Sequence, residues 1–459
     1  MIALFAFTRV LSPTDYGCYS VILASAALIS GVGFQWVRQC LVKFGVDPTF
    51  DLGQLLGSIG VIYAVLFVSM AGFAAVLAAL ISRAAGPFTP AVLAVTVALA
   101  GAQAWFELGL DACRVDLNPL RYGVAGLLRS ALSLASGLLA LWLVHSVIAL
   151  VLGVALGFLA AGLLTAPRWL RGVAQLRKAS WAHAKLLAGY GLPLALTLGF
   201  TLVIDNADRL MLAAMRGAAE AGVYASAYGL GQYAIGSLLS GLGLAVFPLA
   251  AKCYAEHGAD ETGVILGRNL LMIAGLALPA TIGLVLLAPT LSRLLLGNFV
   301  SGESALITAI AAVGVAFAGV RSYAFDVVFM VAGKTKNQAT LLGATAGLNI
   351  LLNLIFIPRW GAVGAASAGL VSFILALGSS VLLGRRHIIA RVRGPDLLKI
   401  VLAAAAMSAI LVLSRGQSSW RSLILRVTVA AVVYACAIFG LNPLEIRTQF
   451  RSVFHSAPT

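Results

Sequence analysis

The sequence predicts an all-α polytopic membrane protein, with about fourteen transmembrane helices arranged as two pseudo-symmetric six-helix bundles plus two C-terminal helices. Three observations predict this class. Of the 459 residues, 61% are hydrophobic and only 10% are charged, whereas a soluble domain carries about 25% charged residues. Apolar stretches of about 20 residues, enough to cross a bilayer core as a helix, recur along the chain. Lysine and arginine gather in alternate connections between these stretches.

The apolar stretches place the expected helices in order. A first segment, residues 1–11, crosses about half of a core about 30 Å thick at about 1.5 Å per residue. We therefore expect the first helix to be truncated and to lie partly upstream of Met1. Full spans follow at residues 18–36, 55–80, 90–112, 122–144, 147–167, 188–214, 221–250, 269–292, 304–332, 338–358, 361–383, 397–414 and 422–441.

The formal net charge of +15 does not indicate a nucleic-acid partner, because the basic residues are spread through short loops and no recognition motif accompanies them. If residues 1–11 form the first helix and the N-terminus is cytoplasmic, 20 of the 31 Lys and Arg fall in cytoplasmic loops and six in the opposite loops. The remaining five lie within spans or at their ends. This bias predicts that both termini are cytoplasmic.

The order of the spans also divides the chain into domains. We expect an N-terminal six-helix bundle at 1–167, with its first helix incomplete, and a C-terminal six-helix bundle at 188–384. A basic cytoplasmic linker at 168–187 separates them, two additional transmembrane helices occupy 385–442, and 443–459 form a cytoplasmic tail. The linker and the basic stretch 385–399 are interpreted as ordinary connectors that follow the charge bias, with recognition of anionic lipid as the alternative.

A short polar motif occurs twice. TDYGCYS at 14–20 and AEAGVYAS at 219–226 share an acid, any residue, Gly, any residue and Tyr. Six expected helices separate the copies, so both lie on one membrane face, which predicts parallel repeats related by an axis along the membrane normal. We expect the first copy to be the outer turn between helices one and two. A looser echo pairs 117–143 with 334–360, the fifth and eleventh helices.

Three segments carry a family resemblance. They are GYGLPLALTLGFTLVIDNADRLMLAAMRGAAEAGVYASAYGLGQ at 189–232, GKTKNQATLLGATAGLNILLNLIFIPRWGAVGAASAG at 333–369 and RVLSPTDYGCYS at 9–20. They resemble the polysaccharide exporters, O-antigen-type flippases of the multidrug/oligosaccharidyl-lipid/polysaccharide flippase superfamily. The resemblance implies two six-helix bundles around a central cavity. It also implies alternating-access flipping of undecaprenyl-diphosphate-linked oligosaccharide across the bacterial inner (cytoplasmic) membrane for polysaccharide export.

The partners that this resemblance implies are the lipid-linked oligosaccharide and membrane lipids, with polysaccharide polymerase or export machinery as a further candidate. The residues themselves indicate no enzyme, because HExxH, P-loop and GxSxG motifs are all absent. We therefore expect no catalytic residue and no cofactor. The five cysteines have no CxxC spacing, so no metal site or disulfide is expected.

Charged residues inside spans are candidate functional sites, because a bilayer makes them costly. Arg129 and Arg321 lie deep in the fifth and tenth helices, and Arg38 and Arg114 lie at the cytoplasmic ends of the second and fourth. Guanidinium groups suit phosphate oxygens, so we expect these four to line a cationic cavity between the bundles that binds the substrate. For Arg38 and Arg114 the favoured alternative is snorkelling to lipid headgroups. Asp326, five residues after Arg321, is a candidate to moderate that arginine.

Two helices carry candidates for gating or ion coupling: Asp205, Asp208 and Arg209 on the seventh, and Glu107 and Asp111 on the fourth. Asp205 and Arg209 are four residues apart and share a helix face, so a local ion pair is the favoured interpretation. Glu107, Asp111 and Arg114 form an acid–acid–base row. This row either binds a proton or a cation or neutralises itself, and both interpretations stay open.

Two rival functions remain at this stage. A cation-coupled multidrug antiporter of the same superfamily would carry cavity carboxylates and aromatic residues rather than arginines. A membrane-bound O-antigen ligase or polymerase would carry a large periplasmic loop, whereas no expected outer loop exceeds about a dozen residues. Asn349 and Asn353, four residues apart on the eleventh helix, are expected to join helices through their amides, with sugar binding as the alternative.

Overall fold

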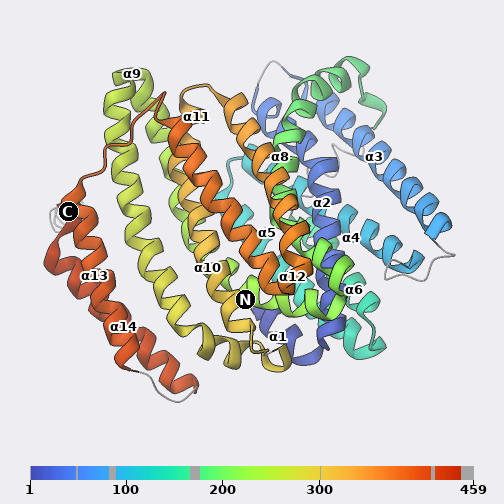
Figure 1. Ribbon diagram of the computed structural model, residues 1–459. Helices are drawn as coiled ribbons and strands as arrows, with labels where there is room; N and C mark the ends of the chain where they lie inside the picture. Colours follow the sequence, from blue (N-terminus) through green and yellow to red (C-terminus); the bar gives the residue numbers. More distant parts are fainter. Residues whose placement is uncertain are drawn as a thin grey trace, which may run out of the picture. The chain divides into compact units, whose positions relative to one another are not determined.

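The computed structural model describes residues 2–47, 50–81, 89–165, 176–299, 301–414 and 419–445, and every regular element among them is helical (Figure 1). This confirms the all-α class. The α-helices are α1 Ile2–Val10, α2 Pro13–Phe44, α3 Leu52–Ile81, α4 Pro90–Val115, α5 Pro119–Val144, α6 Val147–Thr165, α8 Trp181–Arg216, α9 Ala218–Leu295, α10 Ser304–Val320, α11 Asp326–Val331, α12 Thr335–Gly384, α13 Gly394–Leu413 and α14 Trp420–Leu441. The short turns are η1 Leu176–Lys178, η2 Gly297–Phe299, the π-helical η3 Arg321–Phe325 and η4 Pro443–Glu445.

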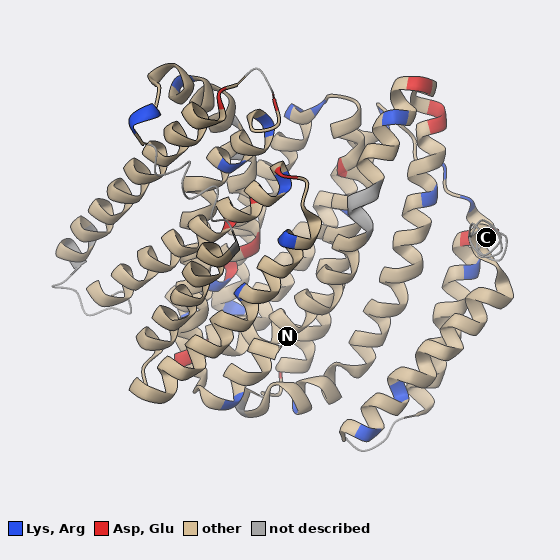
Figure 2. Ribbon diagram, turned by 180° about the vertical axis from the view of Figure 1, so that it is seen from behind, with Lys and Arg blue, Asp and Glu red and all other residues tan. Residues whose placement is uncertain are grey.

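The helices fit a multi-pass membrane protein. In the described part of the chain, ten helices are long and apolar enough to cross a membrane, or eleven with the bent pair Trp181–Leu192 and Thr197–Arg216. Figure 2 shows that most of the helical ribbon carries neither sign of charge and that the basic residues lie mainly near helix ends and connectors. The expected number of about fourteen spans is not established, because α9 and α12 each run through two expected spans without a loop between them.

One glycine interrupts each of these two long helices. As straight helices, α9 with 78 residues would extend about 117 Å and α12 with 50 residues about 75 Å, well beyond a bilayer core about 30 Å thick. The backbone breaks at Gly258 (φ 80°, ψ −167°) and at Gly361 (φ 54°, ψ −131°). Glycine suits both positions because side chains disfavour positive φ. Each break divides its helix into a first and a second limb.

The repeated polar motif begins a helix, and the expectation of an outer turn was wrong. α2 starts at Pro13 and α9 at Ala218, so Asp15 and Glu220 each occupy the third helical position. Proline suits the first helical position because its φ is already helical and no N–H is needed there. A carboxylate in the first turn is stabilised by the helix dipole. The connections before these helices are therefore very short, two residues before α2 and one before α9.

The first compact unit is Asp15–Leu210 and holds α2 to α6 with most of α8. One of its cores joins α2, α3, α4 and α8 through Trp36, Val37, Cys40, Leu41, Phe44, Leu55, Leu56, Ile59, Leu108, Ala112 and Leu187. α8 approaches α2 closely, because a Cβ on Gly191 would collide with Trp36. This contact holds α8 against α2 within the first unit.

The second compact unit combines Met1–Thr14 with Met211–Thr459. α1 belongs to it because Thr8 Oγ1 donates to the carbonyl of Leu295 (3.3 Å) and Arg9 Nη2 to that of Leu294 (3.1 Å). α13 and α14 pack against each other and against α9 (Figure 1). The boundary between the two units falls within α8. Of the expected linker at 168–187, residues 168–175 lie outside the described residues. The division into two six-helix bundles stays a prediction.

Candidate functional site

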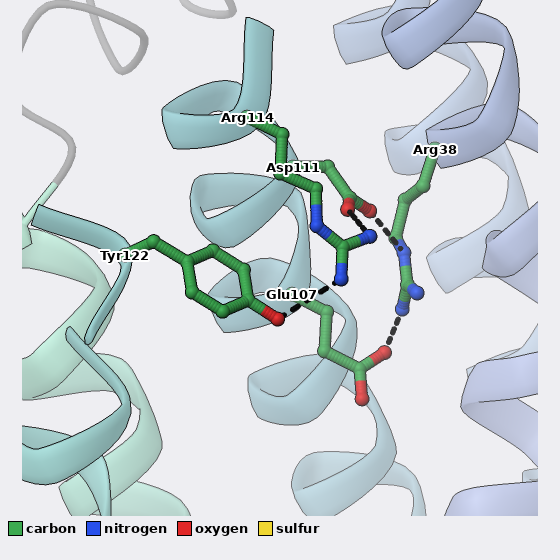
Figure 3. A network of polar contacts seen from close by, with 5 residues as sticks. All are labelled: Arg38, Glu107, Asp111, Arg114 and Tyr122. Carbon is green, nitrogen blue, oxygen red and sulfur yellow. Dashed lines mark hydrogen bonds and ion pairs between the residues drawn. The ribbon is translucent and has the colours of Figure 1, made fainter. Parts of the chain in front are cut away.

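Five polar side chains of the N-terminal unit form one connected group, which we call the Arg38 network: Arg38, Glu107, Asp111, Arg114 and Tyr122 (Figure 3). Arg38 Nε lies 3.0 Å from Asp111 Oδ2, and its Nη1 also pairs with Glu107 Oε2. Arg114 Nη1 lies 2.9 Å from Asp111 Oδ1. Arg114 Nη2 donates to Tyr122 Oη at 2.9 Å. Asp111 therefore bridges two guanidinium groups.

Helix geometry and core packing explain how these residues meet. Glu107, Asp111 and Arg114 are spaced by four and three residues on α4, so they share one face of that helix. α2 lies beside α4 because Leu108 and Ala112 share a core with residues of α2. Arg38 on α2 is thereby placed against the carboxylates of α4. Tyr122 lies in the first turn of α5, which follows α4 after three connecting residues.

The Arg38 network neutralises itself, with two guanidinium groups against two carboxylates. The side chains of Asp111 and Arg38 are 4% and 11% exposed, whereas those of Glu107 and Arg114 are 39% and 52% exposed. A buried ion pair is stable only while both charges and their hydrogen bonds are present. The expectation that Arg38 snorkels to headgroups is therefore wrong, since its guanidinium is held by two carboxylates inside the unit.

Arg321 forms a second buried pair, in the C-terminal unit. Its Nε lies 3.2 Å from Asp326 Oδ2, and the two side chains are 9% and 8% exposed. Ser380 Oγ of α12 donates to Asp326 Oδ1 at 3.0 Å. Residues five apart do not meet on a regular α-helix, but the π-helical turn η3 closes hydrogen bonds between residues i and i+5 and brings them together. The expectation that Asp326 moderates Arg321 is confirmed.

Arg129 is held differently, by aromatic rings. Its guanidinium lies over Phe158 of α6 at 5.3 Å and over Phe106 of α4 at 5.8 Å from the ring centroids, within the range of cation–π attraction. The two rings meet edge to face at 5.7 Å. The structure thus places Arg38, Arg114 and Arg129 in the N-terminal unit and Arg321 in the other unit. The common cationic cavity stays a prediction.

The three charged residues of α8 differ in burial. Asp205 is exposed, Arg209 is half-buried and Asp208 is buried. Asp208 Oδ1 accepts a hydrogen bond from the backbone N–H of Arg209 at 2.7 Å. This contact holds the Asp208 carboxylate against its own helix. The ion pair between Asp205 and Arg209, and a gating or coupling role for the three residues, stay predictions.

The asparagines of α12 join its two limbs. Asn353 Nδ2 donates to Asn349 Oδ1 at 3.0 Å, and Asn349 Nδ2 donates to Ser372 Oγ at 3.5 Å. All three residues are buried. Amide contacts of this kind hold helices together where no water can, which confirms the preferred interpretation of this pair.

Sequence analysis missed one group of potential metal ligands. The ligand atoms of Cys253, His257 and Glu261 lie within 4.8 Å of one another on either side of the break at Gly258. Thiolate, imidazole and carboxylate are the ligands that zinc prefers. The expectation of no metal site rested on the absence of CxxC spacing, a test that does not detect ligands spaced along a single helix. All five cysteines, each within the described part of the chain, are free thiols.

Sequence analysis also missed the polar contacts that cap the two helix ends at the break in α12. Glu220 Oε1, at the start of α9, accepts a hydrogen bond from the backbone N–H of Ala362 at 2.7 Å. Arg216 donates to the carbonyls of Ile357 (3.3 Å) and Pro358 (2.9 Å). The carboxylate thus caps the first N–H of the second limb, and the guanidinium caps the last carbonyls of the first limb, which a helix leaves without partners.

Comparison with known proteins identifies the family. Residues 6–300 match the polysaccharide biosynthesis protein family, a match over more than half of the chain. No curated protein matches the sequence. Among solved structures, the chain is similar to the lipid II flippase MurJ in an inward closed conformation, with a TM-score of 0.68 at 14% identity, covering 96% of this chain and 98% of that one.

Two further structures share the fold. An inward-facing multidrug resistance MATE family transporter of the MOP superfamily gives a TM-score of 0.68 at 14% identity, with 84% of this chain and 92% of that one covered. A MOP superfamily transporter from Pyrococcus furiosus gives 0.54 at 17% identity, with 84% and 90% covered. At these identities the likeness concerns the fold. The chain is therefore a member of the polysaccharide biosynthesis protein family, and it has the all-helical membrane fold of MOP superfamily transporters.

Proposed function

We propose that the protein flips a lipid-linked oligosaccharide, carried on undecaprenyl diphosphate, across the bacterial inner membrane by alternating access. The observation that carries the proposal is the match to the polysaccharide biosynthesis family over residues 6–300. The similarity of the fold to a lipid II flippase over almost the whole of both chains supports it. A transporter is expected here rather than an enzyme.

The glycine breaks in α9 and α12 support fourteen segments in this proposal. Each limb of α9, about 37 to 40 residues, and each limb of α12, about 23 to 26 residues, exceeds the about 20 residues needed to cross a bilayer. Counting the limbs separately, α10 with α11 as one span and α8 as one bent span, thirteen spans follow the short α1. This number matches the positive-charge bias of the loops, which favours cytoplasmic N- and C-termini.

The Arg38 network is the part of the N-terminal unit that we assign to substrate and ion coupling. A diphosphate would compete with Glu107 and Asp111 for the guanidinium groups of Arg38 and Arg114. Binding of the substrate is therefore coupled to the charge of these two carboxylates. Protonation of Glu107 or Asp111 would release a guanidinium for a phosphate oxygen, since charge-assisted hydrogen bonds need a charged acceptor. Glu107 is the more accessible of the two acids, because its side chain is 39% exposed against 4% for Asp111.

The remaining candidates keep subsidiary roles in the proposal. Arg129, over the rings of Phe106 and Phe158, is assigned to the path of the substrate phosphates. Arg321, whose charge is balanced by Asp326, is assigned to the same path when that pair opens. Asp205, Asp208 and Arg209 are assigned to gating.

A cation-coupled multidrug antiporter is the second candidate function. The two carboxylates of the Arg38 network favour it, because a cationic drug or ion needs acidic partners, and MATE family transporters share the fold. The family match favours polysaccharide export instead. A ligase or polymerase is less well supported, because the matched family and the shared fold are not those of an enzyme.

A deletion strain separates these functions. Lipid-linked oligosaccharide is labelled on intact membrane vesicles of known orientation, and its amount in the cytoplasmic leaflet is compared with that of the parent strain. A flippase predicts accumulation in the deletion strain and recovery on re-expression of the wild-type gene. Unchanged amounts together with increased drug sensitivity would support the antiporter and reject the flippase.

A further inference from the structure

The connector between α12 and α13 lies in a groove made by two glycines of α9. Gly263 and Gly267 are four residues apart, so they share one face of the second limb of α9. The backbone N–H of Arg391 donates to the carbonyl of Gly263 at 2.9 Å. A Cβ on Gly263 would collide with the carbonyl of Ile389, and one on Gly267 with that of Arg391. The connector is therefore seated directly on the backbone of α9.

Beside this seat lies a partly open cavity of about 160 Å³ in the C-terminal unit. A cavity of this size has room for several ordered waters or for a small anionic group. Its walls come from α9, the connector and η4, and they consist of Val264, Arg268, Leu271, Arg391, Arg393, Leu444 and Glu445. Three guanidinium groups thus meet a single carboxylate beside three apolar side chains.

The cavity keeps a positive charge after its own ion pairs are counted. Arg391 pairs with Asp260, and Arg393 Nη1 lies 3.7 Å from Glu445 Oε1. Both pairs are largely exposed to solvent, with side chains at least 58% exposed, so each contributes little and opens easily. Among the described residues Arg268 has neither an ion pair nor a hydrogen bond to its side chain. One full positive charge is therefore available to a ligand.

We propose that this cavity is a binding site for a phosphate group, carried by an anionic phospholipid headgroup or by a water-soluble phosphoester. Guanidinium groups bind phosphate oxygens through paired N–H donors. Basic pockets between transmembrane helices are suited to anionic headgroups. The apolar walls suit the glycerol and acyl part of a lipid. A connector that merely followed the positive-inside bias would need no glycine seat and no cavity.

Arg268→Gln tests the proposal without disturbing the seat, because Arg268 is exposed and without a partner in the described part of the chain. Arg386→Gln is the matched control, since Arg386 is an exposed arginine of the same connector that does not line the cavity. Full-length protein is purified in a neutral detergent. Its Tm is measured with added phosphatidylglycerol, phosphatidylcholine, glycerol phosphate or inorganic phosphate, and native mass spectrometry counts the bound lipid.

Phosphatidylglycerol, and not phosphatidylcholine, should raise the Tm of wild type and of Arg386→Gln, because a ligand that binds only the folded state stabilises it. Arg268→Gln should lower the affinity by roughly tenfold, the effect of losing one charge-assisted contact. If glycerol phosphate or inorganic phosphate gives the same Arg268-dependent shift, the source is the water-soluble phosphate. If no phosphate compound discriminates Arg268→Gln from Arg386→Gln, in Tm or in bound lipid, the proposal is overturned.

Discussion

Asp111→Asn is the most informative single change in the N-terminal unit. The amide keeps the size of the side chain but removes the negative charge that bridges Arg38 and Arg114. Breaking a buried ion pair from one side lowers the free energy of unfolding by about 3–5 kcal/mol, because the remaining charge is left without compensation. In this variant Arg38 still has its ion pair with Glu107, and Arg114 is half-exposed to solvent. We therefore expect a loss at the lower end of this range, about 3 kcal/mol.

The assay is a double-mutant cycle in mixed micelles, with the free energy of unfolding measured by denaturant titration. The double variant Arg38→Met/Asp111→Asn removes both buried charges. Its loss in free energy of unfolding should be at least about 1 kcal/mol smaller than the sum of the losses of the two single variants, because the effects of neighbouring residues are not additive. Glu303→Gln, at an exposed carboxylate, is the control and should stay within about 0.5 kcal/mol. A loss below about 1 kcal/mol for Asp111→Asn, or strict additivity, would refute the assignment of this pair as buried and coupled.

Further expectations concern the other sites. Gly361→Ala should lower the free energy of unfolding by about 1–3 kcal/mol, because the φ of 54° at this position suits glycine and an added Cβ would meet the Glu220 carboxylate. Denaturant titration measures this free energy, and Gly347→Ala in the same helix is the control. Asp326→Asn should destabilise more than Ser380→Ala, because it leaves Arg321 buried without its charge partner. Arg129→Ala and Arg321→Ala should each reduce glycan export in a deletion strain at equal protein levels, and full export by both variants would reject the proposed phosphate path.

Sequence reasoning succeeds here where the signal is local. The hydropathy of about 20 residues decides whether a stretch can cross the membrane, so the expected full spans fall on observed helices, although α9 and α12 each take up two of them. Connections between spans are harder to predict from sequence, because a single glycine with positive φ can separate the two limbs of one long helix. Gly258 and Gly361 look like ordinary residues of an apolar run until the backbone is known.

The candidate site was predictable as a set of residues but not as a set of contacts. Burying a charge in a bilayer is costly, which is why Arg38, Asp111 and Arg321 stand out in the sequence. Which charges pair depends on tertiary contacts and helix type. Arg38 and Asp111 are 73 residues apart, and only the packing of α2 against α4 brings them together. Arg321 meets Asp326 because η3 is a π-helical turn, a change of helix type with no clear sequence signal.

Two of the segments that carry the family resemblance contact each other in the C-terminal unit, through residues of α9 and α12. The acid of the A-E-x-G-x-Y motif, Glu220, stabilises the start of α9 from its third position and also caps the N–H of Ala362. Gly361 leaves room for that carboxylate. In the first copy of the motif Asp15 holds the same helical position, but α5 and α6 are joined through His145 in the left-handed region and not through such a glycine. The repeat thus preserves a helix start, and in the second copy Glu220 joins α9 to α12.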